Sequence, residues 1–66
     1  MKIIVMIPTY NERENIFPLL QQVLEIDKDI EVLVVDDNSP DGTWRIVEDM
    51  SEKESRVHLL LRKRRK

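Results

Sequence analysis

The amino-acid sequence predicts an α/β fold with the element order β-α-β-α-β and three parallel strands. Three short apolar runs rich in Val, Ile and Leu alternate with two stretches whose apolar residues recur at helical spacing. Strands that alternate with helices form parallel sheets with right-handed crossovers. The chain of 66 residues fits at most one small domain. We expect residues 1–61 to form half of a doubly wound sheet, followed by a basic tail over residues 62–66.

The first strand is predicted over Ile3 to Ile7. This run is apolar at consecutive positions and rich in β-branched side chains, which is typical of a strand buried on both faces. Pro8, which has no backbone donor, is expected to end the strand. Because no fourth strand is available to pair beside it, the first strand is expected to present an open apolar edge.

The first helix is predicted over about Asn15 to Glu25. One apolar stripe at helical spacing defines it, made of Ile16, Leu19, Leu20, Val23 and Leu24. Asn11 is a plausible N-cap. Pro18 is tolerated only in the first turn, where its missing N–H costs little.

Two further strands and a second helix follow. The second strand is predicted over Ile30 to Val35, and the third over Val57 to Leu61. The helix between them is predicted from Pro40 or Thr43 to Lys53, with Ser39 as N-cap and Pro40 at the first helical position. Its inward stripe is Trp44, Val47 and Met50, with Ile46 beside them.

Composition excludes several classes of function. The chain has no Cys and one His, which excludes disulfides, thiolate metal sites and histidine metal clusters. One Gly excludes a Walker A loop and a G-x-G-x-x-G turn. The apolar runs are too short to span a membrane, and the N-terminal run has no small-residue cleavage site. These features favour a cytoplasmic location.

The charge is unevenly distributed. Residues 1–61 carry six basic and thirteen acidic side chains, whereas all five residues from 62 to 66 are basic. One hypothesis is therefore a non-catalytic module whose basic tail binds membrane or RNA. The alternative is a solvated, frayed terminus. The acidic body argues against general nucleic-acid binding.

Two polar clusters follow the first and second predicted strands, at residues 8–12 (PTYNE) and 36–41 (DDNSPD). In an open parallel sheet, ligands bind beyond the carboxyl ends of the strands. An aromatic ring such as Tyr10 can pack on a base, and a carboxylate can accept hydrogen bonds from a base edge. A phosphorylated ligand would also need a divalent metal or basic groups. The clusters therefore suit a nucleotide.

Each of these residues also has a purely structural interpretation. Tyr10 could be a partly buried packing residue, and Glu12 could favour the start of the helix. Asp36 and Asp37 could be turn and capping residues, and Asp41 part of the helix start. Trp44 is expected in the core, and His58 in the third strand is expected to be structural. No catalytic triad or metal-ligand cluster can be assembled from the residues.

Two long motifs resemble a known family. Residues 7–16 (IPTYNERENI) and 34–43 (VVDDNSPDGT) are separated by the length of a helix and a strand. Together they resemble the start of the family 2 glycosyltransferases, and within these are closest to the dolichol-phosphate (polyprenol-phosphate) mannosyltransferases. The resemblance covers nearly all of the chain, up to about Leu61.

The resemblance implies a GT-A fold, which is a Rossmann-like nucleotide-sugar domain. It implies inverting transfer of mannose from GDP-mannose to a polyprenyl phosphate at the cytoplasmic membrane face, with Mg²⁺ or Mn²⁺, and leaves another nucleotide sugar open as the donor. The positions that match the family's donor contacts are Pro8, Tyr10, Glu12, Val35 and Asp37.

The sequence departs from the family pattern after the third strand. The family continues with glycines, further strands and an Asp-x-Asp motif that holds the metal and the sugar diphosphate, and none of these follows Arg62. We therefore expect an N-terminal fragment without catalytic or metal-binding residues, inactive alone. A competing hypothesis is a receiver-like phosphoacceptor domain, because residues 32–37 (VLVVDD) resemble the Mg²⁺-holding strand end of receivers.

Overall fold

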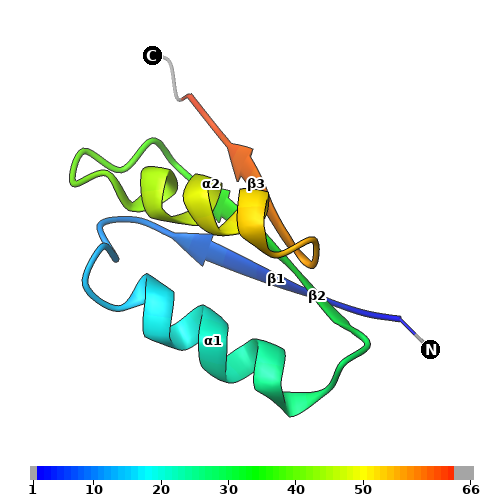
Figure 1. Ribbon diagram of the computed structural model, residues 1–66. Helices are drawn as coiled ribbons and strands as arrows, with labels where there is room; N and C mark the ends of the chain where they lie inside the picture. The colour runs from blue at the N-terminus through cyan, green and yellow to red at the C-terminus, as the bar shows by residue number, and fades with distance from the viewer. Residues whose placement is uncertain (1, 64–66) are drawn as a thin grey trace.

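The computed structural model of the protein describes residues 2–63 and has the predicted β-α-β-α-β order (Figure 1). Its elements are β1 (Ile3–Thr9), α1 (Ile16–Ile26), β2 (Ile30–Asp36), α2 (Thr43–Lys53) and β3 (Val57–Leu61). The strands form one parallel sheet in the order β1-β2-β3. The α/β prediction is therefore confirmed.

The core lies between the sheet and the two helices, which also contact each other. Alternate residues of β2 face it, because successive side chains of a strand point to opposite faces. The buried cluster consists of Ile16, Leu20, Ile30, Val32, Val34, Val47 and Val57. Both helices therefore cover the same face of the sheet.

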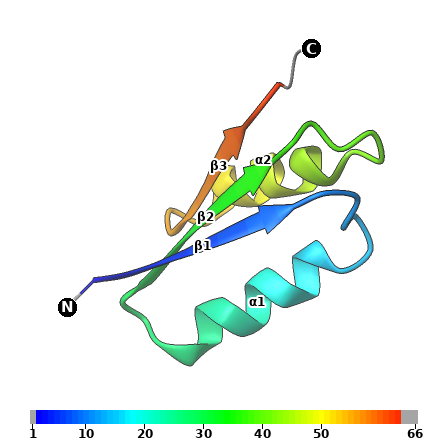
Figure 2. The same ribbon diagram turned by 180° about the vertical axis from the view of Figure 1, so that it is seen from behind.

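The other face of the sheet is open in the described residues, and Figure 2 shows the strands unobstructed from that side. Ile4 and Met6 of β1 are 67% and 65% exposed, and Leu60 of β3 is 50% exposed. The prediction of a strand buried on both faces is therefore wrong for β1. The reason is that consecutive crossovers in one direction place their helices on one side.

β1 is longer than predicted, because it continues through Pro8 to Thr9. Within residues 2–63 this strand pairs with β2 alone, so it is an edge strand, where proline is tolerated. The predicted open apolar edge is present in this part of the chain.

α1 begins at Ile16, close to the predicted start, with Asn15 as its N-cap. Asn11 is not the cap. It adopts a left-handed conformation, with φ of 57°, in the preceding loop. Pro18 is the third residue of the helix and so lies in the first turn, as expected. Leu19 of the predicted stripe is 41% exposed.

α2 begins at Thr43, the later of the two predicted starts, and its N-cap is Gly42 rather than Ser39. Gly42 has φ of 86°, a left-handed conformation that costs a residue with a Cβ about 1–2 kcal/mol. Residues 40 and 41 form a turn instead of the first helical turn. Trp44 lies outside the buried cluster and is only partly buried, so its predicted core position is wrong.

Candidate functional site

The loops that follow β1 and β2 lie side by side at the carboxyl edge of the sheet (Figure 1). We call residues 10–15 the first loop and residues 37–42 the second loop. Thr9 and Asp36 are register partners at the ends of their strands. The next amide, that of Asp37, lies 3.4 Å from the Thr9 carbonyl oxygen that accepts its hydrogen bond. The two polar clusters therefore meet at one edge.

The five predicted contact residues fall on this edge. Pro8 and Val35 are register partners, of which Pro8 is exposed and Val35 is buried. Tyr10 is 57% exposed at the start of the first loop, and Glu12 is exposed two residues later. The Asp37 side chain is 35% exposed at the start of the second loop. Their roles as ligand contacts remain predictions.

Asp36 is the buried centre of the edge. Its side chain is fully buried, and three donors surround it. Thr9 Oγ1 and Ser39 Oγ each donate to Asp36 Oδ1 at 2.7 Å, and the Ser39 amide donates to Oδ2 at 2.8 Å. These bonds satisfy a charge that would otherwise be costly to bury. The structural interpretation of Asp36 as a turn-forming residue is thus confirmed, and it also ties β1 to the second loop.

Asp37 is paired with a residue that sequence reasoning assigned to the basic tail. Arg62 Nε lies 3.2 Å from Asp37 Oδ1, and the Arg62 amide donates to the Asp36 carbonyl oxygen at 2.7 Å. Both side chains are partly exposed, so the ion pair contributes at most about 1 kcal/mol. Residues 64–66 of the predicted tail lie outside the described residues.

Asp41 organises the start of α2, as the sequence predicts. Its Oδ1 accepts hydrogen bonds from the Thr43 amide at 3.0 Å and from the Thr43 hydroxyl. The Thr43 hydroxyl bond is the main reason that the pKa of Asp41 is lowered, and backbone amides and the charge of Arg13 lower it further against partial desolvation. The fold therefore favours the ionised form of this carboxyl.

The Asp41→Asn variant is expected to lower the melting temperature by a few degrees at pH 7. A carboxyl whose pKa is lowered by folding stabilises the fold above its ordinary pKa, here 3.8, and loses that effect as the pH falls through the folded value. The difference from wild type should therefore vanish in strong acid. Thermal unfolding followed by circular dichroism between pH 7 and pH 2 checks this. Asp49→Asn, which removes one negative charge at an exposed position of α2, is the control for the change in net charge.

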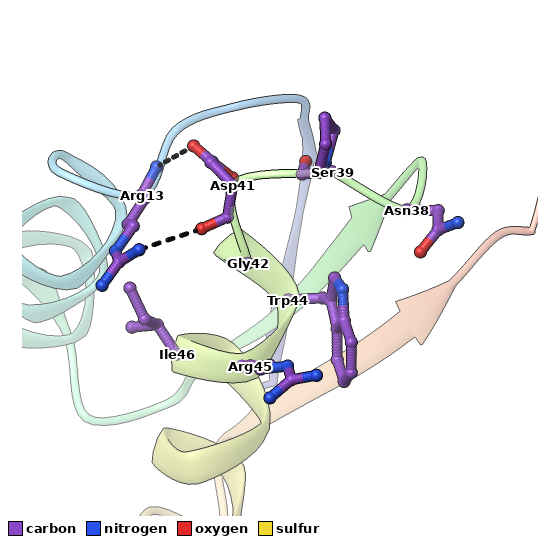
Figure 3. Close-up of a pocket in the computed structure, with 9 residues that line it drawn as sticks. Arg13, Asn38, Ser39, Asp41, Gly42, Trp44, Arg45 and Ile46 are labelled. Carbon is purple, nitrogen blue, oxygen red and sulfur yellow. Dashed lines mark hydrogen bonds between the residues drawn. The ribbon is translucent and has the colours of Figure 1, made fainter.

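An open pocket of about 630 Å³ lies beside the second loop and the start of α2 (Figure 3). It is lined by Arg13, Asn38, Ser39, Pro40, Asp41, Gly42, Trp44, Arg45 and Ile46. The Arg45 guanidinium lies 5.0 Å from the centre of the Trp44 ring, as in a cation–π contact. None of the five predicted contact residues lines this pocket, so it is not the predicted site.

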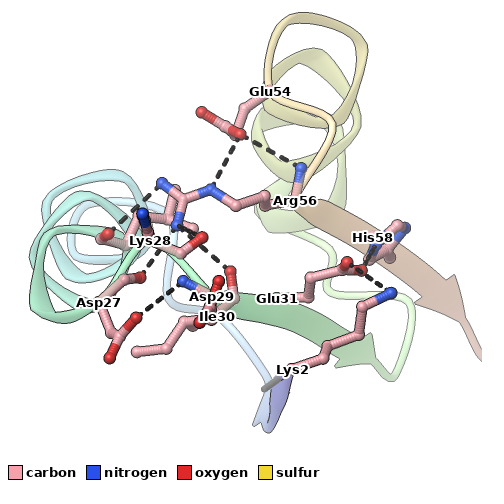
Figure 4. Close-up of polar contacts among 10 residues, drawn as sticks. Lys2, Asp27, Lys28, Asp29, Ile30, Glu31, Glu54, Arg56 and His58 are labelled. Atoms are coloured by element: carbon pink, nitrogen blue, oxygen red, sulfur yellow. Dashed lines mark hydrogen bonds and ion pairs between the residues drawn. The ribbon is translucent and has the colours of Figure 1, made fainter.

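The opposite edge of the sheet carries a separate polar cluster (Figure 4). His58 Nε2 lies 2.9 Å from Glu31 Oε1, and Lys2 Nζ lies 3.1 Å from Glu31 Oε2. Mainly because of the contact with His58, and also because of Lys2, the pKa of Glu31 is lowered. His58 lies on β3 and contacts Glu31 of β2, which fits the structural role predicted for it.

Residues 2–63 contain neither a metal-binding cluster nor a membrane-spanning helix. No three or more His, Cys, Asp or Glu side chains lie together there in a way that could hold a metal ion. Within the same residues, neither helix is long and apolar enough to cross a membrane. The metal that the resemblance implies therefore does not fit the side chains of residues 2–63.

A parallel α/β sheet with polar loops at the carboxyl ends of neighbouring strands is the arrangement of one half of a Rossmann-like fold, in which ligands bind at that edge. Family comparison is more specific, because the model of glycosyl transferase family 2 matches residues 4–66. The chain belongs to this family.

Individual relatives agree with this assignment. The chain is 46% identical over 55 residues to a dolichol-phosphate mannosyltransferase of Pyrococcus furiosus, covering 80% of this chain and 16% of the relative. It is 42% identical over 60 residues to a polyprenol monophosphomannose synthase of Mycolicibacterium smegmatis, covering 89% and 23%. The chain thus spans less than a quarter of either relative.

A solved structure shares the fold. The mannosyltransferase PcManGT from Pyrobaculum calidifontis, in complex with GDP-Man and Mn²⁺, superposes with a TM-score of 0.75 at 35% identity. The match covers 98% of this chain and 21% of that one. The GT-A fold prediction is therefore confirmed.

Proposed function

We propose that this chain forms the nucleotide-binding part of a glycosyltransferase that uses GDP-mannose. One observation carries the proposal: the two motifs that match the family's donor contacts lie side by side at the ligand-binding edge. The donor is supported by the GDP-Man complex of PcManGT, which covers 98% of this chain. A polyprenyl phosphate acceptor is supported by the names of the two curated relatives.

The chemistry of the edge suits a guanine base. Tyr10 is exposed and can pack on the base, while Pro8 offers an exposed apolar surface at the end of β1. The Asp37 carboxylate accepts hydrogen bonds, and guanine presents an N–H and an amino group on one edge where uracil presents a single N–H. Because Arg62 Nε lies 3.2 Å from Asp37 Oδ1, a base edge would reach this carboxylate through Oδ2.

The remaining parts of the reaction are proposed for the whole protein. Inverting transfer, a divalent metal and action at the cytoplasmic membrane face follow from the resemblance, and Mn²⁺ is present in the PcManGT complex. Within residues 2–63 no group of His, Cys, Asp or Glu side chains could hold the metal. We therefore expect the isolated chain to release no product from GDP-mannose, metal and a polyprenyl phosphate, and measurable product would contradict this expectation.

The receiver hypothesis finds no support at this edge. A phosphoacceptor site needs carboxylates that are open to Mg²⁺ and a phosphodonor. Here the Asp36 carboxylate is fully buried and already accepts from three donors, so it is closed to both.

Titration with nucleotides tests the donor assignment. GDP is expected to bind with a dissociation constant on the order of millimolar or weaker, equivalent to about 4 kcal/mol, because only the base is held. Backbone NMR shifts should change at Tyr10, Glu12 and Asp37, with smaller changes for UDP. Asp37→Asn should weaken the GDP response, whereas the charge-matched control Asp49→Asn should not. Tighter binding of UDP than of GDP would contradict the proposal.

A further inference from the structure

Three consecutive backbone amides of the first loop donate to side chains that follow β2. The pairs are Asn11 N to Ser39 Oγ at 2.9 Å, Glu12 N to Thr43 Oγ1 at 2.9 Å and Arg13 N to Asp41 Oδ2 at 3.1 Å. The paired residues lie 28, 31 and 28 positions apart in the chain. We call the three acceptors, Ser39, Asp41 and Thr43, the latch.

The geometry of the two latch hydroxyls fixes the direction of their hydrogen bonds. Ser39 Oγ lies against Asp36 Oδ1, and Thr43 Oγ1 lies against Asp41 Oδ1. Since a carboxylate only accepts, each hydroxyl must donate to it and keep its lone pairs for a first-loop amide. Ser39 is 2% exposed and Thr43 is fully buried, so water competes little for these bonds. Each hydroxyl is therefore a preoriented acceptor.

The latch goes beyond what a turn and a helix start require. Ser and Asp in such motifs usually bond to amides two or three residues further along. Asp41 does this through Oδ1 and the Thr43 amide, but its Oδ2 accepts from Arg13 in the other loop, as Figure 3 shows. Arg13 Nη1 also donates to the Asp41 carbonyl oxygen at 3.4 Å. The motif thus holds a segment that is remote in sequence.

We propose that Ser39, Asp41 and Thr43 are positioning residues that fix the first loop so that Tyr10 and Glu12 face the same ligand as Asp37. This inference rests on the proposed function. Tyr10 lies between Thr9, which is bound to Asp36, and Asn11, which is bound to Ser39. Its backbone is therefore held on both sides although its ring is 57% exposed. A loop held in its binding conformation loses less entropy when a ligand binds.

Amide exchange and nucleotide titration of Thr43→Val and Thr43→Ser test the latch. Valine keeps the shape of threonine but removes the acceptor for the Glu12 amide, whereas serine keeps it. The readout is the ratio of the Glu12 to the Val32 exchange rate, because the Val32 amide, which donates to the Arg56 carbonyl oxygen, reports opening of the sheet rather than of the first loop. In Thr43→Val this ratio should rise about five- to tenfold, the effect of one lost hydrogen bond, and Thr43→Ser should restore it.

The GDP-induced NMR shifts of Tyr10 and Glu12 should also weaken in Thr43→Val and return in Thr43→Ser. Val23→Ala, which trims a partly buried side chain on α1, is the control for general destabilisation and should change neither readout. If Thr43→Val is too unstable to measure, Asp41→Ala should raise exchange at Arg13 relative to Val32 in the same way.

The outcomes separate the latch from the proposed function. An unchanged Glu12 ratio in Thr43→Val would overturn the latch, and a raised ratio with unchanged GDP shifts would overturn its positioning role. If GDP causes no NMR shifts in wild type at any concentration, both the proposed function and the positioning role are contradicted. The exchange ratios would still decide whether the latch holds the loop.

Discussion

Asp36→Ala is expected to abolish cooperative folding of the chain at 25 °C. The substitution removes a fully buried carboxylate and leaves the Thr9 hydroxyl and both donors of Ser39 without their acceptor. Each buried donor left unsatisfied costs about 1–3 kcal/mol. A domain of this size has a free energy of unfolding of about 3–10 kcal/mol. One face of the sheet is open in the described residues, which places this chain at the lower end of that range.

Circular dichroism during thermal and urea unfolding checks this result. Asp36→Asn keeps one acceptor oxygen and is expected to unfold between wild type and Asp36→Ala. The neighbouring Asp37→Ala is the matched control, because its side chain is 35% exposed and its ion pair is worth at most about 1 kcal/mol. A melting temperature of Asp36→Ala within a few degrees of wild type would show that water or neighbouring groups replace the carboxylate.

The pattern of apolar residues was sufficient to predict the five elements and their order. Apolar runs and helical spacing depend on the local chain, and parallel pairing follows from their alternation. Exposure of one sheet face was not predictable in this way. Ile4 and Met6 have the same apolar character as Val5 and Ile7, which pack against the core. Which face the helices cover depends on the crossovers rather than on these residues.

The starts of both helices depend on contacts that are remote in the sequence. Asn11 and Ser39 both have N-cap propensity, yet they bond to each other across 28 positions instead of capping a helix. Propensity scales describe only the neighbouring residues, so this outcome has no local signal. A hint was available in the density of Ser, Thr and Asp in residues 36–43, which exceeds what one helix cap requires.

The position of the candidate site was predictable from the order of the strands, whereas the contacts between its side chains were not. The rule for parallel sheets brings Pro8 beside Val35 and Asp37 beside Thr9. The pairing of Arg62 with Asp37 was missed, because the run of basic residues suggested a solvated tail. Only the path of β3 along β2 brings Arg62 to this edge.

Arg56→Met is expected to lower the free energy of unfolding by about 2–3 kcal/mol, because charge-assisted hydrogen bonds are worth about 1.5–3 kcal/mol. Arg56 connects the end of α1 and the turn before β2 to the start of β3 (Figure 4). Its guanidinium donates to four backbone carbonyl oxygens, those of Asp27 and Lys28 at 3.1 Å, Ile30 at 3.3 Å and Leu24 at 3.4 Å. Its side chain is 26% exposed, so water replaces part of the lost bonding. The expected loss of stability therefore corresponds to one or two such bonds rather than to all four.

This change corresponds to a drop in melting temperature of about 8–24 °C for a domain of this size. Arg56→Lys keeps the positive charge and should recover part of the loss. The recovery stays partial because an ammonium group cannot reach carbonyls on several sides as a planar guanidinium does. The control Arg45→Met removes an exposed arginine that lies over Trp44 and should cost at most about 1 kcal/mol. Arg56 lies at the edge opposite the two loops, so the GDP shifts of Arg56→Met should match those of wild type wherever both are folded. Altered GDP shifts in the folded variant would mean that the Arg56 contacts, and not the latch alone, set the position of the first loop.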